Sequence, residues 1–146
     1  ELKRSELTVD DILFVIAGAS IGKVAIMNAD LLPSNTNQAV SFIRIMPKYS
    51  DIKKYIWYVL QSDMIKTYIS LFSVQSAQPN ISMENLGNFR MPYVDDNKEI
   101  LEIVEYLDKR CIELDNLIAK KTALLEEMET YKKSVIYEYV TGKKEV

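Results

Sequence analysis

One long helical pattern in the last third of the chain limits its fold more than any other feature. Residues 98–140 contain neither proline nor glycine, and their apolar side chains recur mostly three or four positions apart. The pattern predicts a single helix that ends at Val140, with Thr141-Gly142-Lys143 directly after it. Roughly 43 residues at about 1.5 Å each give a rod on the order of 64 Å long.

A helix of this length has to bury its apolar stripe against something. The preceding domain is too small to cover the whole stripe, so we expect a partner helix; the alternative is a helix folded back on its own domain. Lys121 and Lys132 interrupt strict heptads, which favours an antiparallel helix pair over a parallel zipper. The residues expected to pack on the partner helix are Ile103, Leu107, Leu114, Leu117, Ile118, Leu125, Met128 and Val135.

The residue types that are missing argue against catalysis. The chain has no histidine, so it lacks the commonest general base and cannot form a Ser-His-Asp or Cys-His nucleophile by itself. Its one cysteine, Cys111, falls on the helical stripe and is expected to be a small buried apolar residue. We therefore expect a non-enzymatic protein with no metal and no cofactor. No apolar run approaches the roughly 18 residues of a membrane span, and we expect a cytoplasmic location.

The charge balance gives no overall signal for nucleic acid. Residues 1–96 carry nine Lys or Arg against ten Asp or Glu, and residues 97–146 carry nine against eleven. A chain with a net charge of −3 lacks the basic excess that drives sequence-independent binding to phosphates. A locally basic face, or a basic partner protein, could still supply the phosphate contacts.

The first 96 residues have the pattern of a small mixed domain. Three short apolar runs predict strands, the first two of them joined as a hairpin by a glycine-containing turn at residues 18–22. Helical periodicity then predicts one helix or two short ones, and Ser82 is a plausible N-cap for a later helical turn. The expected strands are 12–17, 23–27 and 39–45, and the expected helical stretches are 51–72 and 81–86. The predicted fold class is α+β, with a small mixed α/β domain at 1–96 and a long coiled-coil-type helix at 97–146.

The turn Gly18-Ala19-Ser20-Ile21-Gly22-Lys23 invites comparison with a phosphate-binding loop. That motif needs four residues between its glycines and a Ser or Thr after the lysine, whereas this chain has three residues and Val24. A tight hairpin turn is the better interpretation. Ser20 and Lys23 could still contact a phosphate, through the hydroxyl and the positive charge respectively.

Two loops are rich in amide side chains. They lie at residues 34–38 and 75–80, and amides of Asn and Gln can pair with adenine through two hydrogen bonds. The alternative is that these side chains only satisfy backbone groups of their own loops. The candidate DNA-contacting residues are Ser20, Lys23, Asn35, Asn37, Gln38, Gln75 and Gln78.

Three segments of the chain, in order and across nearly its whole length, form a combined sequence pattern. The first is residues 18–25 with Asn35-Thr36-Asn37-Gln38-Ala39. The second is Gln78-Pro79-Asn80-Ile81-Ser82 with 86–89 and Met91-Pro92. The third joins Glu99, 103–108 and Leu117-Ile118 to 131–136 and Val140-Thr141-Gly142-Lys143. Together they resemble the specificity subunits of type I restriction-modification systems. The chain differs from the family pattern at Tyr93 and Ile100, and Ile100 extends the apolar stripe.

The resemblance implies a division of labour. Residues 1–96 would be the later part of a target recognition domain. The family usually has a further stretch before the strand at residues 12–17, and its absence here suggests a fragment or a minimal half-subunit. The helix would be a spacer that pairs antiparallel with a second spacer helix, in cis or from a homodimer. Double-stranded DNA and the methyltransferase subunits would be the direct partners of the whole chain. The restriction subunit would be an indirect partner. The S-adenosylmethionine and ATP chemistry would belong to those subunits.

A competing class is a coiled-coil interaction protein with no role in DNA binding. It accounts equally well for the long helix. It leaves the two amide-rich loops and the turn at residues 18–23 without a purpose.

Overall fold

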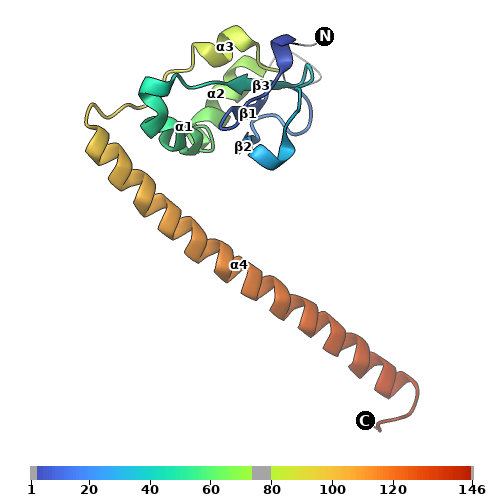
Figure 1. The fold of residues 1–146 in the computed structure, drawn as a ribbon. Helices are drawn as coiled ribbons and strands as arrows, with labels where there is room; N and C mark the ends of the chain where they lie inside the picture. Colours follow the sequence, from blue (N-terminus) through green and yellow to red (C-terminus); the bar gives the residue numbers. More distant parts are fainter. Residues whose placement is uncertain (1–2, 74–79, 146) are drawn as a thin grey trace. The chain divides into compact units, whose positions relative to one another are not determined.

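A computed structural model describes residues 3–73 and 80–145, which divide into two compact units, Glu1–Val104 and Glu105–Val146. The first, the globular unit, contains a small sheet and short helices (Figure 1). The second, the helical unit, contains the greater part of one long helix. The predicted α+β class, with one long C-terminal helix, is confirmed.

Three antiparallel strands form the sheet in the order β2-β1-β3 (Figure 1). The central strand β1 (Ile12–Val15) pairs with β2 (Val24–Ile26) on one side and with β3 (Val40–Ile43) on the other. All three predicted strands are confirmed, and the β1–β2 hairpin with them. Each strand is two or three residues shorter than the apolar run that predicted it.

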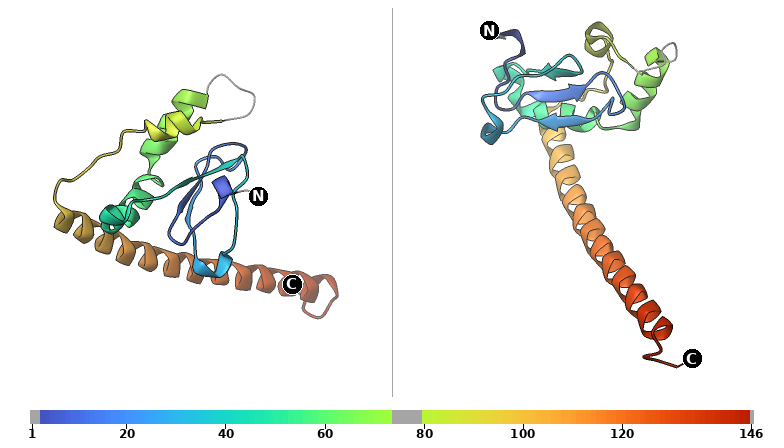
Figure 2. Two further views of the ribbon diagram at one scale, coloured as in Figure 1. Left: turned by 45° about the horizontal axis from the view of Figure 1, so that its top comes forward. Right: turned by 90° about the vertical axis from the view of Figure 1, so that its right-hand side faces the viewer.

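The sheet buries one face because side chains alternate along a strand. Ile12 and Phe14 of β1 are fully buried, whereas Leu13 and Val15, which alternate with them, are half-buried. The buried face packs against the short helices, which lie beside the sheet in both views of Figure 2.

The helical stretch predicted at residues 51–72 is two helices, α1 (Lys53–Val59) and α2 (Asp63–Ser73). A turn separates them, in which the Ser62 hydroxyl donates to the Val59 carbonyl at 2.6 Å. The short 3-10 helix η3 (Pro47–Ile52) leads into α1. Two further 3-10 helices, η1 (Lys3–Ser5) and η2 (Ala29–Leu31), lie in the first third of the chain.

The predicted N-cap at Ser82 is confirmed. Helix α3 (Met83–Gly87) begins directly after it, and the Ser82 hydroxyl accepts a hydrogen bond from the Asn85 amide at 3.0 Å. This bond satisfies a backbone donor that the first turn of a helix would otherwise leave without a partner.

Helix α4 (Asn97–Val140) has 44 residues, which corresponds to about 66 Å. At its start, the Asp96 carboxylate accepts a hydrogen bond from the Lys98 amide at 2.8 Å. At its end, Gly142 has a positive φ of 72°, and the Lys143 amide donates back to the Glu138 carbonyl at 2.9 Å. The predicted helix and its stop signal are therefore confirmed.

The globular unit has two adjoining clusters of buried side chains. One joins β1 to α1, α2 and α3, with Phe14, Leu60 and Ile81 among its members. The other joins α1 to the start of α4 through Tyr55 and Ile100. The predicted division at residues 96 and 97 falls at the start of α4, whereas the packed core includes its first two turns.

Candidate nucleic-acid interface

One end of the sheet brings three separate chain segments together. The turn at residues 18–23 leaves the end of β1, and residues 37–39 enter β3 beside it, because the Ile16 amide donates to the Ala39 carbonyl at 2.8 Å. Asn80 forms a bridge with Ala17, and the Ile81 amide donates to the Ile16 carbonyl at 2.9 Å. Segments that are far apart in sequence therefore meet at this loop end of the sheet.

The turn at residues 18–23 is fixed by its glycines and by α2. Gly18 and Gly22 have positive φ angles of 88° and 84°, which residues other than glycine rarely adopt. A Cβ at Gly22 would lie 3.0 Å from the Ile69 methyl of α2, so the turn approaches that helix closely. The turn is closed by backbone hydrogen bonds from Ile21 to Gly18 and from Lys23 to Ser20, and it presents Ser20 and Lys23 at the surface, where both are exposed.

The amide-rich segment before β3 divides into two parts. Asn37 and Gln38 are exposed at the loop end of the sheet, although the Asn37 side-chain oxygen already accepts from the Ala39 amide at 2.9 Å. Asn35 lies earlier, where it pairs with Glu6 and its amide donates to the Ser5 hydroxyl at 3.1 Å. Asn37 therefore fills in part the alternative role for these amides, which is to satisfy backbone groups of their own loop.

The structure therefore brings four of the seven candidate DNA-contacting residues together at the loop end of the sheet. Ser20, Lys23, Asn37 and Gln38 share the loop end, whereas Asn35 is bound to the N-terminal segment. Gln75 and Gln78 lie outside the described residues. The DNA contacts of all seven stay a prediction.

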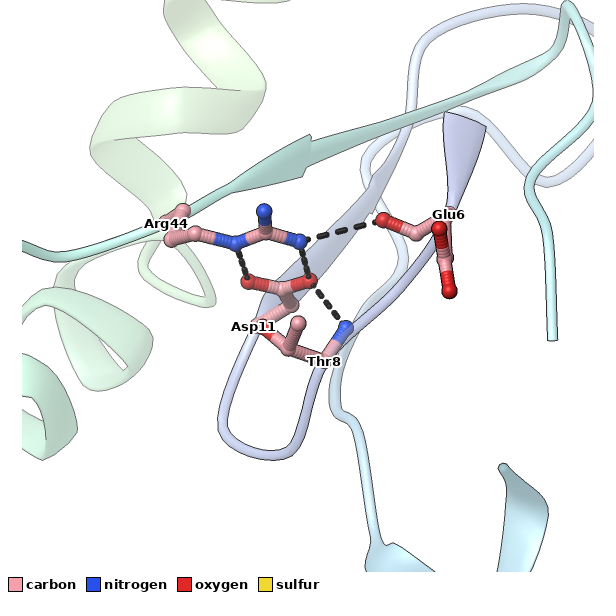
Figure 3. Close-up of polar contacts among 4 residues, drawn as sticks. All are labelled: Glu6, Thr8, Asp11 and Arg44. Carbon is pink, nitrogen blue, oxygen red and sulfur yellow. Dashed lines mark hydrogen bonds and ion pairs between the residues drawn. The ribbon is translucent and has the colours of Figure 1, made fainter. Parts of the chain in front are cut away.

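Sequence reasoning missed an ion pair at the opposite end of the sheet (Figure 3). The Arg44 guanidinium donates from Nε to Asp11 Oδ1 at 2.8 Å and from Nη2 to Oδ2 at 2.6 Å. Arg44 Nη2 also donates to the Glu6 carbonyl at 3.1 Å, and the Thr8 amide donates to Asp11 Oδ2 at 2.7 Å. These bonds tie the chain before β1 to the chain after β3 and so hold the two strands in register.

Asp11 is almost fully buried, and its charge needs these partners. Burial by itself raises the pKa of the Asp11 carboxyl, but the hydrogen bonds from Arg44 and Thr8 and the charge of Arg44 together lower that pKa below its ordinary value. The only sequence signal for the pair is a charged residue, Arg44, within the apolar run at residues 39–45.

The helix face predicted to meet a partner is exposed over most of its length. Leu114, Ile118, Leu125 and Met128 each expose more than half of their surface. Leu117 is exposed as well, whereas Ile103, Leu107 and Val135 are half-buried. Cys111, predicted to be buried, is also half-buried. The packing of this face on another helix stays a prediction.

Comparison with known protein families shows to which family the chain belongs. Residues 3–126 match the type I restriction modification DNA specificity domain. The chain belongs to this family. The match covers the globular unit and about the first half of the helical unit, so α4 lies within the matched domain as far as residue 126. A comparison with curated proteins gave no match.

Among residues 3–73 and 80–145, His, Cys, Asp and Glu side chains do not gather into any group of three that could hold a metal ion. In the same described residues, no helix is both long enough and apolar enough to cross a membrane.

Proposed function

We propose that this chain is the DNA-recognition subunit of a type I restriction-modification system, which reads one half of a bipartite site and scaffolds the methyltransferase subunits. The observation that carries the proposal is the family match over residues 3–126. In this role the chain catalyses no step. The methyltransferase subunits transfer the methyl group, and the restriction subunit joins the complex through them.

The loop end of the sheet is the reading surface in this proposal. Asn37 and Gln38 have amide groups that can pair with base edges, and Ser20 and Lys23 can contact the phosphates that set the register on the duplex. The hydrogen-bonded turn at residues 18–23, which approaches α2 closely at Gly22, supports this role, because a reading surface works best if its side chains are held in place before DNA arrives. Asn35, Gln75 and Gln78 remain candidate contacts.

The net negative charge of the chain suggests that partner proteins supply the positive charge needed for DNA affinity. With a net charge of −3, the chain lacks the cationic surplus that usually supplies most of the affinity for DNA. We propose that basic methyltransferase subunits clamp the duplex while this chain selects the sequence. Tight, specific DNA binding by the isolated chain at physiological salt would contradict that part of the proposal.

Methylation mapping tests the reading surface. The chain is co-expressed with its methyltransferase subunits, and methylated sites are sequenced for the wild type, for Lys23→Ala and for the double variant Asn37→Ala/Gln38→Ala. The proposal predicts lost or altered methylation while the subunits still co-purify. The matched control is Asn28→Ala, an exposed amide that follows β2 at the other end of the sheet and should leave the methylated sequence unchanged.

The alternative is a helical interaction module with no role in DNA binding. It is favoured by the exposed apolar face of α4. It predicts that the complex forms and that none of the three loop substitutions alters the methylated sequence.

A further inference from the structure

Two kinds of contact hold the turn at residues 18–23 in place. Backbone hydrogen bonds join its base to β1, because the Gly22 amide donates to the Val15 carbonyl at 2.9 Å and the Val15 amide donates to the Lys23 carbonyl at 3.0 Å. Side-chain packing holds the part before Gly22, where the half-buried Ile21 lies against the core cluster to which α2 contributes. The position of the turn therefore depends on side chains of α2 as well as on the sheet.

Ile69 of α2 is the side chain that the turn approaches most closely. It is buried, and its Cδ1 methyl would lie 3.0 Å from a Cβ added at Gly22, which is tighter than most Cβ contacts in proteins. Gly18 has a similar positive φ, but among the residues that the structure describes a Cβ added there would meet no atom within 4 Å. The close approach is therefore a property of one glycine and one methyl group.

Helix α2 is tied to the globular unit on more than one side. Ile65 and Ile69, one helical turn apart, are both buried in the core cluster. The Tyr68 hydroxyl donates to the Asn85 carbonyl at 2.9 Å, and the Tyr68 ring lies edge-on to the Phe89 ring with their centroids 5.0 Å apart. Extra bulk between the turn and α2 should therefore displace the turn and not the helix.

We propose that Ile69 is a positioning residue for DNA reading, because its Cδ1 methyl sets the distance of the turn from α2 and so the point at which Ser20 meets a phosphate. The inference rests on the proposed function, in which Ser20 contacts the DNA backbone. Binding groups have to be held within about 0.5 Å of their productive geometry. The short Ser20 side chain cannot follow a displaced turn, so one added methyl group is enough to lose its contact.

Two alanine substitutions separate the contact with Ile69 from backbone strain. Gly22→Ala and Gly18→Ala both place a side chain at a positive φ and carry a similar backbone penalty, but only Gly22→Ala presses on Ile69. The chain is assembled with its methyltransferase subunits, and binding is measured to a duplex that carries the mapped methylation site. Gly22→Ala should bind about tenfold more weakly than Gly18→Ala, which is the effect of losing one hydrogen bond to a charged group.

A second substitution in α2 should restore the affinity. Ile69→Val removes the Cδ1 methyl, so Gly22→Ala/Ile69→Val should bind within about twofold of Gly18→Ala. The matched control is Gly22→Ala/Ile65→Val, which deletes the same group from a buried isoleucine one turn earlier and should not restore binding. Ile69→Val should likewise not improve Gly18→Ala.

Ser20→Ala distinguishes positioning from a purely structural role of Ile69. In the otherwise wild-type chain, Ser20→Ala should weaken DNA binding about fivefold. In the Gly22→Ala chain it should weaken binding by less than about twofold, because the displaced turn has already lost the Ser20 contact. If Ile69 only stabilised the fold, the effects of Ser20→Ala and Gly22→Ala on DNA affinity would add.

Contrary outcomes separate this inference from the proposed function. Equal affinities of Gly22→Ala and Gly18→Ala, or equal rescue by Ile65→Val and Ile69→Val, would overturn the inference and leave the proposed function standing. If the substitutions at Ser20, Lys23, Asn37 and Gln38 all left DNA affinity and the methylated sequence unchanged, the proposed reading surface and this inference would both fail.

Two single substitutions test the inference if Gly22→Ala does not fold. Ile69→Val lets the turn settle closer to α2 and should change the DNA affinity of the complex by about threefold, whereas Ile65→Val should leave it within about 1.5-fold of the wild type. Both remove one buried methyl group from the same helix, so their effects on stability should be alike. Equal effects of the two variants on DNA affinity would contradict a positioning role for Ile69.

Discussion

The same helix has two different environments along its length. In the first two turns of α4, Ile100 is fully buried and Val104 nearly so, in a cluster with Tyr55 and Val59 of α1. Further along, Ile118 and side chains like it on the same apolar stripe are mostly exposed. The apolar periodicity is alike in both parts, so periodicity specifies which face of a helix is apolar but not what covers it.

This difference separates folding from assembly. The first two turns belong to the core of the globular unit and contribute to its stability, whereas the apolar side chains from Leu114 to Met128 are exposed and add little to it. Substitutions in the two parts should therefore affect different measurements.

The largest expected contrast is between two isoleucines. Ile100→Ala should lower the free energy of unfolding of the globular unit by about 3 kcal/mol, because it removes a fully buried side chain and leaves a cavity. Ile118→Ala should change that free energy by less than about 0.5 kcal/mol. Denaturant unfolding followed by Trp57 fluorescence measures both. Equal destabilisation by the two variants would remove the distinction between the parts.

A second contrast is between two aspartates with cationic partners. Asp11→Ala should destabilise the globular unit by about 2 kcal/mol, since the Arg44 guanidinium and the Thr8 amide lose their shared acceptor. Asp63→Ala removes an exposed pair with Lys66 and should have no measurable effect. Urea titrations at pH 7 compare them, and a stable Asp11→Ala protein would contradict the structural role of the ion pair.

Acid should remove the contribution of the charged Asp11 carboxylate to the free energy of unfolding. The pKa of the folded Asp11 carboxyl is lowered, so its contribution is complete above the unfolded pKa of about 3.9 and is lost as the pH falls through the folded pKa. The difference in unfolding free energy between wild type and Asp11→Asn should be constant from pH 7 to pH 5. It should then shrink below about pH 4. A difference that persists unchanged to pH 2 would show that the charge is not what stabilises the fold.

The smallest expected effect is that of a single hydroxyl. The Tyr55 hydroxyl donates to the Pro92 carbonyl at 3.1 Å and fixes the segment that leads into α4. Tyr55→Phe should cost about 1 kcal/mol of unfolding free energy. Tyr106→Phe, the same change on an exposed residue of the helical unit, should cost nothing measurable by thermal unfolding.

The elements that depend on neighbouring residues could be predicted from the sequence. The limits of α4 follow from a long stretch without proline or glycine and from a glycine just beyond its end, and Ser82 caps α3 through residues three apart. The hairpin likewise follows from two apolar runs on either side of a short turn. In each case the deciding contacts lie within a few residues of one another.

The elements that depend on distant residues could not be predicted. Asp11 and Arg44 are 33 positions apart, and no local pattern pairs them. Only the strand pairing explains why Asn35 contacts the N-terminal segment whereas Asn37 and Gln38 lie at the loop end, although all three belong to one polar run. The two environments of α4 also depend on tertiary packing, because the stripe itself does not change at Val104.

A transfer of the globular unit tests the central claim most directly. Residues 1–104, which include the two buried turns of α4, are replaced by the equivalent unit of a specificity subunit with a known half-site, and the rest of α4 is kept. Methylated sites are then sequenced after co-expression with the methyltransferase subunits. The methylated half-site should then become that of the donor. An unchanged methylated sequence in an intact complex would contradict the assignment of DNA reading to the globular unit.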